Sequence, residues 1–337
     1  MNSRRLFSTL MLAAAIAVTC VAPAYAKQPP KGTLWVTNTA LNNVSVYEAS
    51  TGMLIATIAV GLKPIGITAP SGLDKVYVSN EDSNTVSVIS KSSLSVISTI
   101  SGFTGTKPHH VGQSPDGNFV YVAMFGSNKV AVIETATDQL VAEFITGASA
   151  ARTHAVFATE DGETLLVTNS VVNEVAALDA HTGAIQWSVG VGNNPSEVLA
   201  AKRKFAYVTI RNENKVQAIN LKNLAIEGEV AVGAQPDTIQ ITPDGNTLIV
   251  ALRGNPGLVS FVDLNDGLAV TPMAISGATT TGHNAISKNG RFSYVVIEGA
   301  TPGVALVDNK KHEVIATYAY PGGGRPHGII YDRKLIR

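Results

Sequence analysis

Val76-Tyr77-Val78-Ser79-Asn80 is one copy of a short, strand-like segment that occurs seven times along the chain. The other six copies begin at Leu34, Val120, Leu165, Ala206, Leu248 and Ser293. Successive copies start 42, 44, 45, 41, 42 and 45 residues apart. A period near this length, with several short strands in each repeat, is typical of β-propeller blades. The repeat therefore predicts an all-β, seven-bladed propeller.

Each repeat contains four strand-like segments, and turn signals such as Ser-Pro-Asp-Gly at 114–117 separate the repeats. In the first repeat, the three segments that follow the copy are Asn43–Glu48, Met53–Val60 and Ile65–Ala69. The series begins at Thr33 with the second strand of a blade, and it ends with an isolated first strand at Pro326–Ile330. We predict that this last strand completes the first blade and closes the ring.

The composition agrees with a β-architecture. Only 15% of the 337 residues are charged, well below the usual quarter, and 30 are glycine. The 25 Lys and Arg balance the 25 Asp and Glu, so we expect no sequence-specific nucleic-acid binding. No apolar run after residue 26 is long enough to span a bilayer. We expect the mature protein to be a monomer with no transmembrane segment.

Residues 1–26 have the three parts of a secretory signal peptide: two arginines, an apolar stretch, and Ala24-Tyr25-Ala26 as a small-x-small cleavage site. We predict cleavage after Ala26, a single mature domain at 27–337, and a periplasmic or secreted location. Ser3-Arg4-Arg5-Leu6-Phe7 also resembles a twin-arginine export signal, and an ordinary secretory signal is the alternative. A membrane anchor fits less well, because the apolar stretch is short and contains hydroxyl side chains.

Cleavage at this site changes the charge and removes the only thiol. The mature chain keeps 23 basic residues (25 minus Arg4 and Arg5) against 25 acidic ones, a net charge of −2. Cys20, also a candidate for lipidation, is lost with the leader. The mature protein therefore has no disulfide, no cysteine-ligated metal and no c-type haem site.

The repeat copies resemble those of the YVTN-repeat (YncE-like) propellers. Leu-Trp-Val-Thr-Asn at 34–38, Val-Tyr-Val-Ser-Asn at 76–80 and the Ser-Pro-Asp-Gly turn carry this resemblance, which extends over the whole mature chain. It implies a seven-bladed propeller with WD40-like blades, whose binding site lies where the innermost strands begin. It leaves the function open, because such propellers include surface proteins, periplasmic binding proteins and lactonase-like members.

The predicted starts of the seven innermost strands place four histidines at one position of the repeat. In blade order the residues at this position are His327, Ile65, His109, His154, Ser196, Asp237 and His283. Neutral imidazole is the commonest metal ligand, and a set without thiolates suits Zn, Cu or Fe better than Ca or Mg. The predicted metal ligands are His109, His154, His283, His327 and Asp237. The alternative is that duplication copied one Pro-His-Gly turn without any ligand.

His110 and Glu197 occupy the next position of the same strands. Because side chains alternate along a strand, we expect both to point away from the channel unless the strand start rotates them inward. At the level of architecture, the histidine set resembles propellers that hold a histidine-bound copper cluster or a histidine-ligated haem. Only the idea that a propeller mouth can hold a metal is taken from these proteins.

Cations gather two residues before the histidine position. Arg325, Lys63, Lys107 and Arg152 occupy this place in the first four blades, and Arg211 and Arg253 lie in nearby loops. This basic crescent predicts a small anionic ligand carrying a carboxylate or phosphate. A solvated rim without any ligand is the alternative.

Three functions follow from these residues. The first is a periplasmic protein that binds a metal ion, a small anionic ligand or both at the channel mouth. The second is a lactonase-like hydrolase, in which His154 or His283 is the base, Glu197 or Asp237 assists, and Arg152 holds the carboxylate of the substrate. The third is a protein-interaction scaffold without a small-molecule site.

Overall fold

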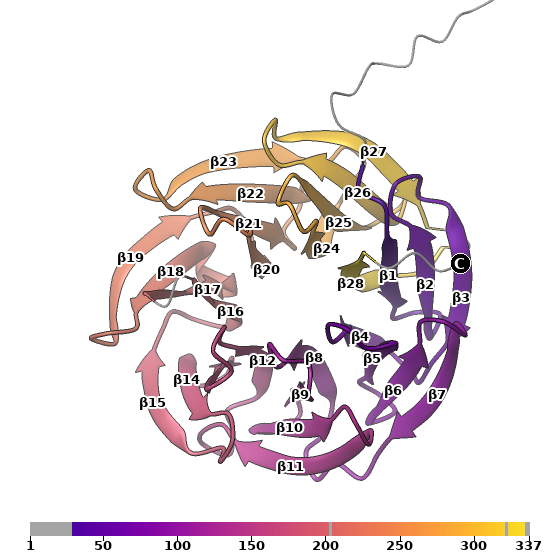
Figure 1. Ribbon diagram of the computed structural model, residues 1–337. Helices are drawn as coiled ribbons and strands as arrows, with labels where there is room; N and C mark the ends of the chain where they lie inside the picture. The colour runs from indigo at the N-terminus through magenta and orange to yellow at the C-terminus, as the bar shows by residue number, and fades with distance from the viewer. Residues whose placement is uncertain (1–28, 202–203, 321–322, 334–337) are drawn as a thin grey trace, which may run out of the picture.

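Seven four-stranded antiparallel sheets are arranged in a ring around a common axis (Figure 1). This computed structural model describes residues 29–201, 204–320 and 323–333. The predicted all-β, seven-bladed propeller is confirmed, whereas the predicted signal peptide at 1–26 lies outside the described residues. No helix in the described part of the chain is long and apolar enough to cross a membrane.

Each blade contains one innermost, one second, one third and one outer strand. The innermost strands, from blade 1 to blade 7, are β28 (Pro326–Asp332), β4 (Pro64–Thr68), β8 (Pro108–Gln113), β12 (Thr153–Ala158), β16 (Pro195–Ala201), β20 (Pro236–Ile241) and β24 (Thr280–Ile286). The second strands, which contain the seven repeat copies, are β1 (Thr33–Asn38), β5 (Lys75–Asn80), β9 (Phe119–Met124), β13 (Thr164–Asn169), β17 (Phe205–Ile210), β21 (Thr247–Leu252) and β25 (Phe292–Glu298).

The two outer layers of strands complete the blades. The third strands are β2 (Asn43–Glu48), β6 (Thr85–Ser90), β10 (Lys129–Glu134), β14 (Glu174–Asp179), β18 (Lys215–Asn220), β22 (Leu258–Asp263) and β26 (Gly303–Asp308). The outer strands are β3 (Leu54–Ala59), β7 (Ser95–Ile100), β11 (Gln139–Ile145), β15 (Ile185–Gly190), β19 (Ala225–Ala231), β23 (Ala269–Ala274) and β27 (Glu313–Ala319). A 3-10 turn, η1 (Arg211–Glu213), follows β17.

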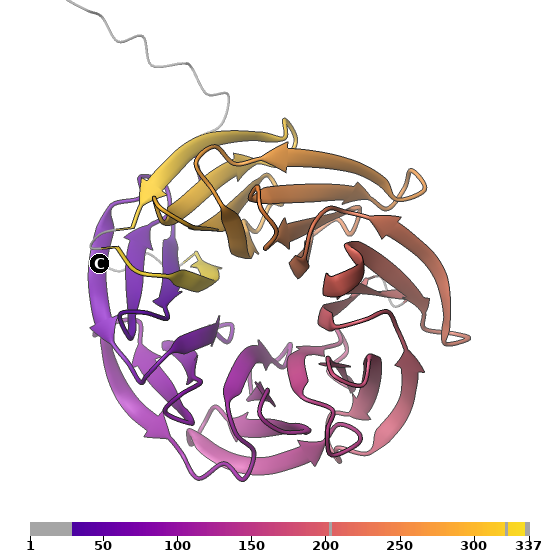
Figure 2. The same cartoon turned by 180° about the vertical axis from the view of Figure 1, so that it is seen from behind.

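The ring closes as predicted, because the last strand pairs with the first. In the antiparallel β1–β28 ladder, Trp35 lies opposite Ile330 and Leu34 lies opposite Tyr331. Figure 2 shows the ring from behind, with the yellow end of the chain beside its indigo beginning. Lys91 of blade 2 adds an ion pair to the closing strand, with Nζ 2.6 Å from Asp332 Oδ2. Blade 1 therefore contains both ends of the propeller.

A column of large aromatic residues packs the blades against one another. These residues stand at one position of the second strands, and all are buried: Trp35, Tyr77, Tyr121, Tyr207 and Tyr294. Each belongs to a different apolar cluster of the ring. Burial of such large side chains contributes strongly to packing between sheets. The column therefore supplies one large side chain to each of five apolar clusters between the blades.

Hydroxyl groups at the fourth position of the repeat copy connect neighbouring blades. Thr209 Oγ1 accepts a hydrogen bond from Glu197 N at 2.9 Å and donates one to Asp237 O of the next blade, also at 2.9 Å. Thr37, Ser79 and Thr168 make the same pair of contacts in their own blades. These buried hydroxyls fix the positions, along the propeller axis, of neighbouring innermost strands in blades 1 to 3 and in blades 4 to 6.

A β-bulge interrupts the start of the innermost strands. In blade 3, Pro108 lies opposite Met124 and Val111 lies opposite Val122. An advance of three residues along β8 therefore matches an advance of two residues along β9. The other innermost strands have a comparable shift in register. A bulge re-aims side chains and breaks strict alternation. Two successive residues of an innermost strand can therefore face the propeller axis.

Candidate functional site

The innermost strand of blade 7 has a different alignment from the one that the sequence suggested. Thr281 takes the place that Pro108 has in blade 3, since each pairs with the fifth residue of the repeat copy in its own blade. Gly282 therefore occupies the predicted histidine position, and His283 lies one residue further along the strand. The predicted alignment was wrong by one residue, because it placed His283 in register with the other histidines, whereas the pairing of β24 with β25 sets the register at Thr281.

The four predicted histidines still come together at the axis. The ring centroid of His109 lies 4.6 Å from that of His154 and 6.4 Å from that of His327. The His283 ring approaches the same layer from below, 4.8 Å from His327. His154 Nδ1 lies 2.8 Å from the carbonyl oxygen of Ser196, to which it must donate, so its Nε2 has a free lone pair.

Three of these imidazoles, those of His109, His154 and His283, are neutral at physiological pH. Burial lowers the pKa of His154 to about 3, and the positive charge of Arg211 adds to this effect. Burial and the neighbouring imidazoles hold the pKa of His109 well below its usual value. Burial and His327 do the same for His283. A neutral imidazole can accept a proton or bind a metal, but it adds no charge that would attract an anion.

Asp237 is a buried carboxylate between two arginines, with only 2% of its surface exposed. It forms ion pairs with Arg211 and with Arg253, whose Nη1 lies 3.1 Å from Asp237 Oδ2, and it accepts a hydrogen bond from Ser196 Oγ at 2.7 Å. Burial raises the pKa of Asp237, but the charges of Arg211 and Arg253 outweigh it and hold the pKa well below its usual value. Asp237 is therefore ionised, and the positive charges of Arg211 and Arg253 already balance its negative charge.

Two acids that the sequence reasoning missed neutralise much of the basic crescent. Glu298 Oε1 lies 3.0 Å from Arg253 Nη2, and Glu298 Oε2 lies 3.0 Å from Arg325 Nε. Glu81 Oε1 lies 2.8 Å from Lys63 Nζ and 3.9 Å from Lys107 Nζ. Both acids directly follow a repeat copy, at the position that Arg211 and Arg253 occupy in their own blades. Comparing this sixth position across the repeats would have revealed them.

Arg152 is the exception among the predicted cations, because it forms no ion pair with any described residue. Its guanidinium carbon lies 5.7 Å from the centre of the Phe125 ring. The backbone of Arg152 is left-handed, with a φ of 51°, as are those of Lys63 and Lys107. Non-glycine residues in this region cost about 1 kcal/mol or more and cluster at functional sites.

A pocket of about 460 Å³ lies at the mouth, between blades 3, 4 and 5. We call it the mouth pocket. The residues that line it are Phe125, Arg152, His154, Ser170, Val171, Asn173, Asn193, Asn194, Arg211 and Asn212. Arg152 and Arg211 are the only charged side chains in this lining, and it includes no carboxylate. The mouth pocket is therefore basic and rich in hydrogen-bond donors.

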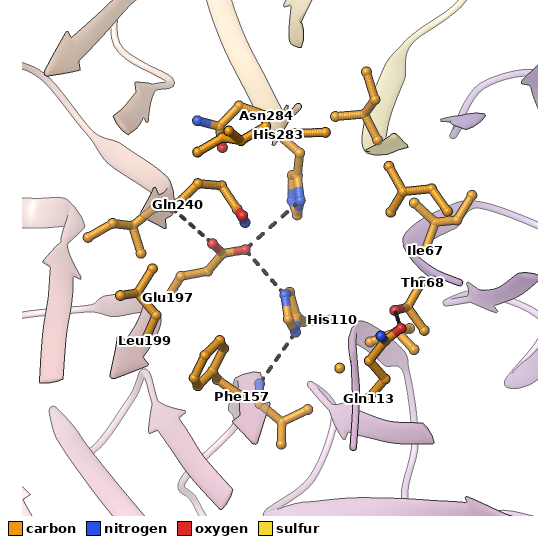
Figure 3. A pocket seen from close by; sticks show the side chains of 18 of the residues that line it. Ile67, Thr68, His110, Gln113, Phe157, Glu197, Leu199, Gln240, His283 and Asn284 are labelled. Atoms are coloured by element: carbon orange, nitrogen blue, oxygen red, sulfur yellow. Dashed lines mark hydrogen bonds and ion pairs between the residues drawn. The ribbon is translucent and has the colours of Figure 1, made fainter. Parts of the chain in front are cut away.

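A second cavity, of about 400 Å³, lies deeper along the axis and is lined by the innermost strands of all seven blades. We call it the deep cavity. Figure 3 shows Glu197 there between His110 and His283. His110 and Glu197 face the channel, which is the alternative that strand alternation left open, because the β-bulge at the strand start breaks the alternation.

The contacts within the deep cavity determine where Glu197 and His110 carry their protons. His110 Nε2 lies 3.5 Å and His283 Nδ1 lies 3.9 Å from Glu197 Oε1, and Glu197 Oε2 accepts a hydrogen bond from Ile239 N at 3.0 Å. His110 Nδ1 accepts a hydrogen bond from Val156 N at 3.4 Å, so the ring proton of His110 is on Nε2. Burial raises the pKa of Glu197 to about 8 and lowers that of His110 to about 4.

The predicted metal ligands do not form a finished metal site. Within residues 29–201, 204–320 and 323–333, no three His, Cys, Asp or Glu side chains are arranged as a group that could hold a metal ion. Asp237 in particular is committed to Arg211 and Arg253. Binding of a metal by the histidines therefore stays a prediction that requires rotation of side chains.

These features define a closed seven-bladed propeller with a basic pocket at its mouth and an acid-containing cavity below a layer of histidines. The chain belongs to the YNCE-like beta-propeller family, whose sequence model matches residues 38–336. This match confirms the family that the repeat copies predicted. No curated protein sequence matches the chain.

Several solved structures share the fold. A functionally unknown protein from Desulfotomaculum acetoxidans DSM 771 is 14% identical, with a TM-score of 0.75, covering 89% of this chain and 98% of the other. A putative 6-phosphogluconolactonase from Bacteroides fragilis NCTC 9343 is 16% identical, with a TM-score of 0.72 and coverage of 91% and 99%. Dihydro-heme d1 dehydrogenase NirN, in complex with DHE, is 15% identical, with a TM-score of 0.63 and coverage of 90% and 75%. At these identities the likeness extends to the fold alone.

Proposed function

We propose that this protein is an exported binding protein that takes a small anion, bearing a carboxylate or phosphate group, in the mouth pocket. The observation that carries the proposal is the charge of the lining: two guanidinium groups and no carboxylate. Guanidinium groups bind carboxylates and phosphates through paired, charge-assisted hydrogen bonds. The neutral His154 at the base of the pocket does not oppose an anion.

The two arginines contribute differently to such a site. Arg152 has no ion pair among the described residues, and the Phe125 ring beneath it restricts its position. Arg211 shares its charge with Asp237 but still lines the pocket. The hydroxyl of Ser170 and the amides of Asn193, Asn194 and Asn212 supply further polar groups. We expect Arg152 to provide most of the attraction and the amides to provide orientation.

Thermal unfolding in the presence of inorganic phosphate or citrate tests this proposal. A ligand at 100 times its Kd stabilises the folded protein by about 2.7 kcal/mol. We expect an anion-dependent rise in Tm that Arg152→Gln abolishes. Lys63→Gln is the matched control, because Lys63 stands at the same position in blade 2 but is paired with Glu81. Equal stabilisation of both variants would contradict the proposal.

A lactonase-like hydrolase is the second candidate, because the free Nε2 lone pair of His154 lies in the same pocket as Arg152. One structural relative is described as a putative 6-phosphogluconolactonase, which makes anionic lactones the substrates to test. The low pKa of His154, about 3, makes it a weak base, whereas a general base works best with a pKa near the operating pH. Binding is therefore favoured over hydrolysis. Lactone turnover that is lost in His154→Ala would reverse this preference.

A bound transition metal, Zn, Cu or Fe, is a separate proposal for His109, His154, His283 and His327. Their rings are close together, and the Nδ1–H of His154 donates to a backbone carbonyl, as is usual for a metal-bound histidine. The nearby charges of Arg211 and Arg253 oppose a cation. Elemental analysis of the purified protein, compared with the double variant His109→Ala/His283→Ala, measures the metal content. Metal-free protein that takes up none would end this proposal.

Export to the periplasm is part of the proposed function and rests on the pattern of residues 1–26. Fractionation of cells followed by N-terminal sequencing tests it, and we expect the mature chain to begin at Lys27. The remaining alternative, a protein-interaction scaffold, gains support only if neither anions nor metals bind. Each of the two measurements above can therefore reject it.

A further inference from the structure

The deep cavity has the opposite charge character to the mouth pocket. No Lys, Arg or Asp is among the residues that line it, and Glu197 is its only carboxyl group. Only 5% of the surface of Glu197 is exposed. A buried carboxylate is costly unless a positive charge or several hydrogen bonds compensate it. The compensation at this glutamate therefore decides what the cavity accepts.

Glu197 forms no ion pair with a lysine or arginine of the described residues. Its Oε2 has the amide of Ile239, and its Oε1 has a long contact, 3.5 Å, with His110 Nε2. His110 is neutral, because its Nδ1 accepts the amide hydrogen of Val156 and only Nε2 carries a proton. The nearest nitrogen of His283, at 3.9 Å, is beyond hydrogen-bonding distance. Oε1 therefore has room for a strong cationic donor. Without such a donor, burial raises the pKa of Glu197 to about 8, so a cation that binds at neutral pH has to displace the carboxyl proton.

A metal ion is not the cation that this arrangement favours. A histidine that binds a metal normally donates its other ring N–H to an acceptor. At His110 the other nitrogen instead faces the amide hydrogen of Val156, so Nε2 would have to lose its proton without a place for it on Nδ1. A cation that brings its own N–H groups needs no such change.

The rest of the cavity suits an organic body attached to that cation. Ile67 and Leu199 contribute apolar walls, and Phe157 adds an aromatic ring (Figure 3). Ile239 and Ile329 also line the cavity. Polar side chains also line the cavity, among them Gln240 and Asn284, and two others, Thr68 and Gln113, already satisfy each other through a 2.7 Å hydrogen bond. A cavity of this volume with apolar walls and a few convergent polar groups is typical of a small-molecule site.

We propose that the deep cavity is a second binding site that takes a small primary alkylammonium ion, with its NH₃⁺ group on Glu197 Oε1 and its alkyl chain against the apolar walls. This site is independent of anion binding in the mouth pocket. Each can fail without the other, because they use different residues on opposite sides of the histidine layer.

Isothermal titration with hexylammonium chloride, 1-hexanol and sodium hexanoate at pH 9, above the pKa of about 8 of Glu197 and where a primary alkylamine is still protonated, tests the proposal. We expect hexylammonium to bind at least tenfold more tightly than the other two. Glu197→Gln, which keeps the shape of the side chain, should remove this preference, and the surface control Glu163→Gln should keep it. Leu199→Phe, which narrows the cavity without touching the charge, should weaken hexylammonium more than ethylammonium.

Several results would overturn the proposal. Equal binding of hexanol and hexylammonium would show that the charge of Glu197 is not used. Displacement of hexylammonium by saturating phosphate would place it in the mouth pocket instead. Stoichiometric Zn²⁺ uptake that Glu197→Gln abolishes would show that the cation is a metal. If Glu197→Gln does not fold, equal weakening of both amines by Leu199→Phe would still refute the site.

Discussion

Replacing Asp237 by asparagine should destabilise the protein and at the same time make it more responsive to anions. Asp237 is buried and paired with Arg211 and Arg253, so its loss leaves two guanidinium groups with less compensation. Removing one partner of a buried ion pair costs 3–5 kcal/mol. Both arginines keep some contact with water, and Arg253 keeps Glu298, so we expect a loss of about 3 kcal/mol. That corresponds to a fall in Tm of about 6 °C for a chain of this size.

Added phosphate should then recover much of this loss, because an external anion can bind where the carboxylate was. The assay is thermal unfolding of wild type and variant with and without saturating phosphate. Asp308→Asn is the matched control, since Asp308 is also a buried carboxylate, paired with Arg291 at 2.6 Å, but lies at the end of blade 7 opposite the mouth. The reasoning is refuted if Asp237→Asn is as stable as wild type, or if phosphate rescues both variants equally.

Three further predictions concern stability. Burial raises the pKa of Glu298, but His327, Arg253 and Arg325 bring it down to about 2. Ionised Glu298 therefore stabilises the folded protein by about 3 kcal/mol above its unfolded pKa, and this contribution is lost as pH falls toward 2. In urea unfolding, the difference in free energy of unfolding between wild type and Glu298→Gln should accordingly shrink on acidification. Gly66→Ala should cost about 1–3 kcal/mol, because its Cβ would lie 2.3 Å from the His109 carbonyl oxygen, whereas Gly190→Ala, with open space, should not. Thr209→Val should cost about 1–3 kcal/mol in the same assay, because it leaves Glu197 N and Asp237 O without this hydrogen-bond partner. Unchanged stability would contradict the bridging role of this hydroxyl.

The fold was predictable because its information is local and repeated. Alternating residues and turn signals marked the strands closely: the predicted segment Met53–Val60 is β3 at Leu54–Ala59, and the predicted closing strand Pro326–Ile330 is β28 at Pro326–Asp332. Closure also followed from the phase of the repeat, since an unpaired first strand needs the incomplete first blade. No contact between distant residues had to be known in advance.

The site was less predictable because it depends on pairing between strands and between blades. The bulge that turns both His109 and His110 toward the axis is a property of the ladder, and the alternation of residues along one strand cannot reveal it. Neutralisation of the basic crescent by Glu81 and Glu298 requires contacts between side chains from different segments. The predicted cations and histidines do lie near the axis. Which cations can bind a ligand depends on which of them form ion pairs with acids of the same site, and the sequence does not reveal these pairs.

Closure through β1 and β28 has a consequence for the order of folding. The N–H of Gly328 reaches the hydroxyl of Thr37 across 291 residues of chain. Closing so long a loop costs about 5 kcal/mol of chain entropy, whereas blades 2 to 7 are each built from consecutive hairpins. Blade 1 is therefore expected to form last. Until then β1 presents an unpaired edge, and the interval before closure is when two chains are most apt to join strands by mistake.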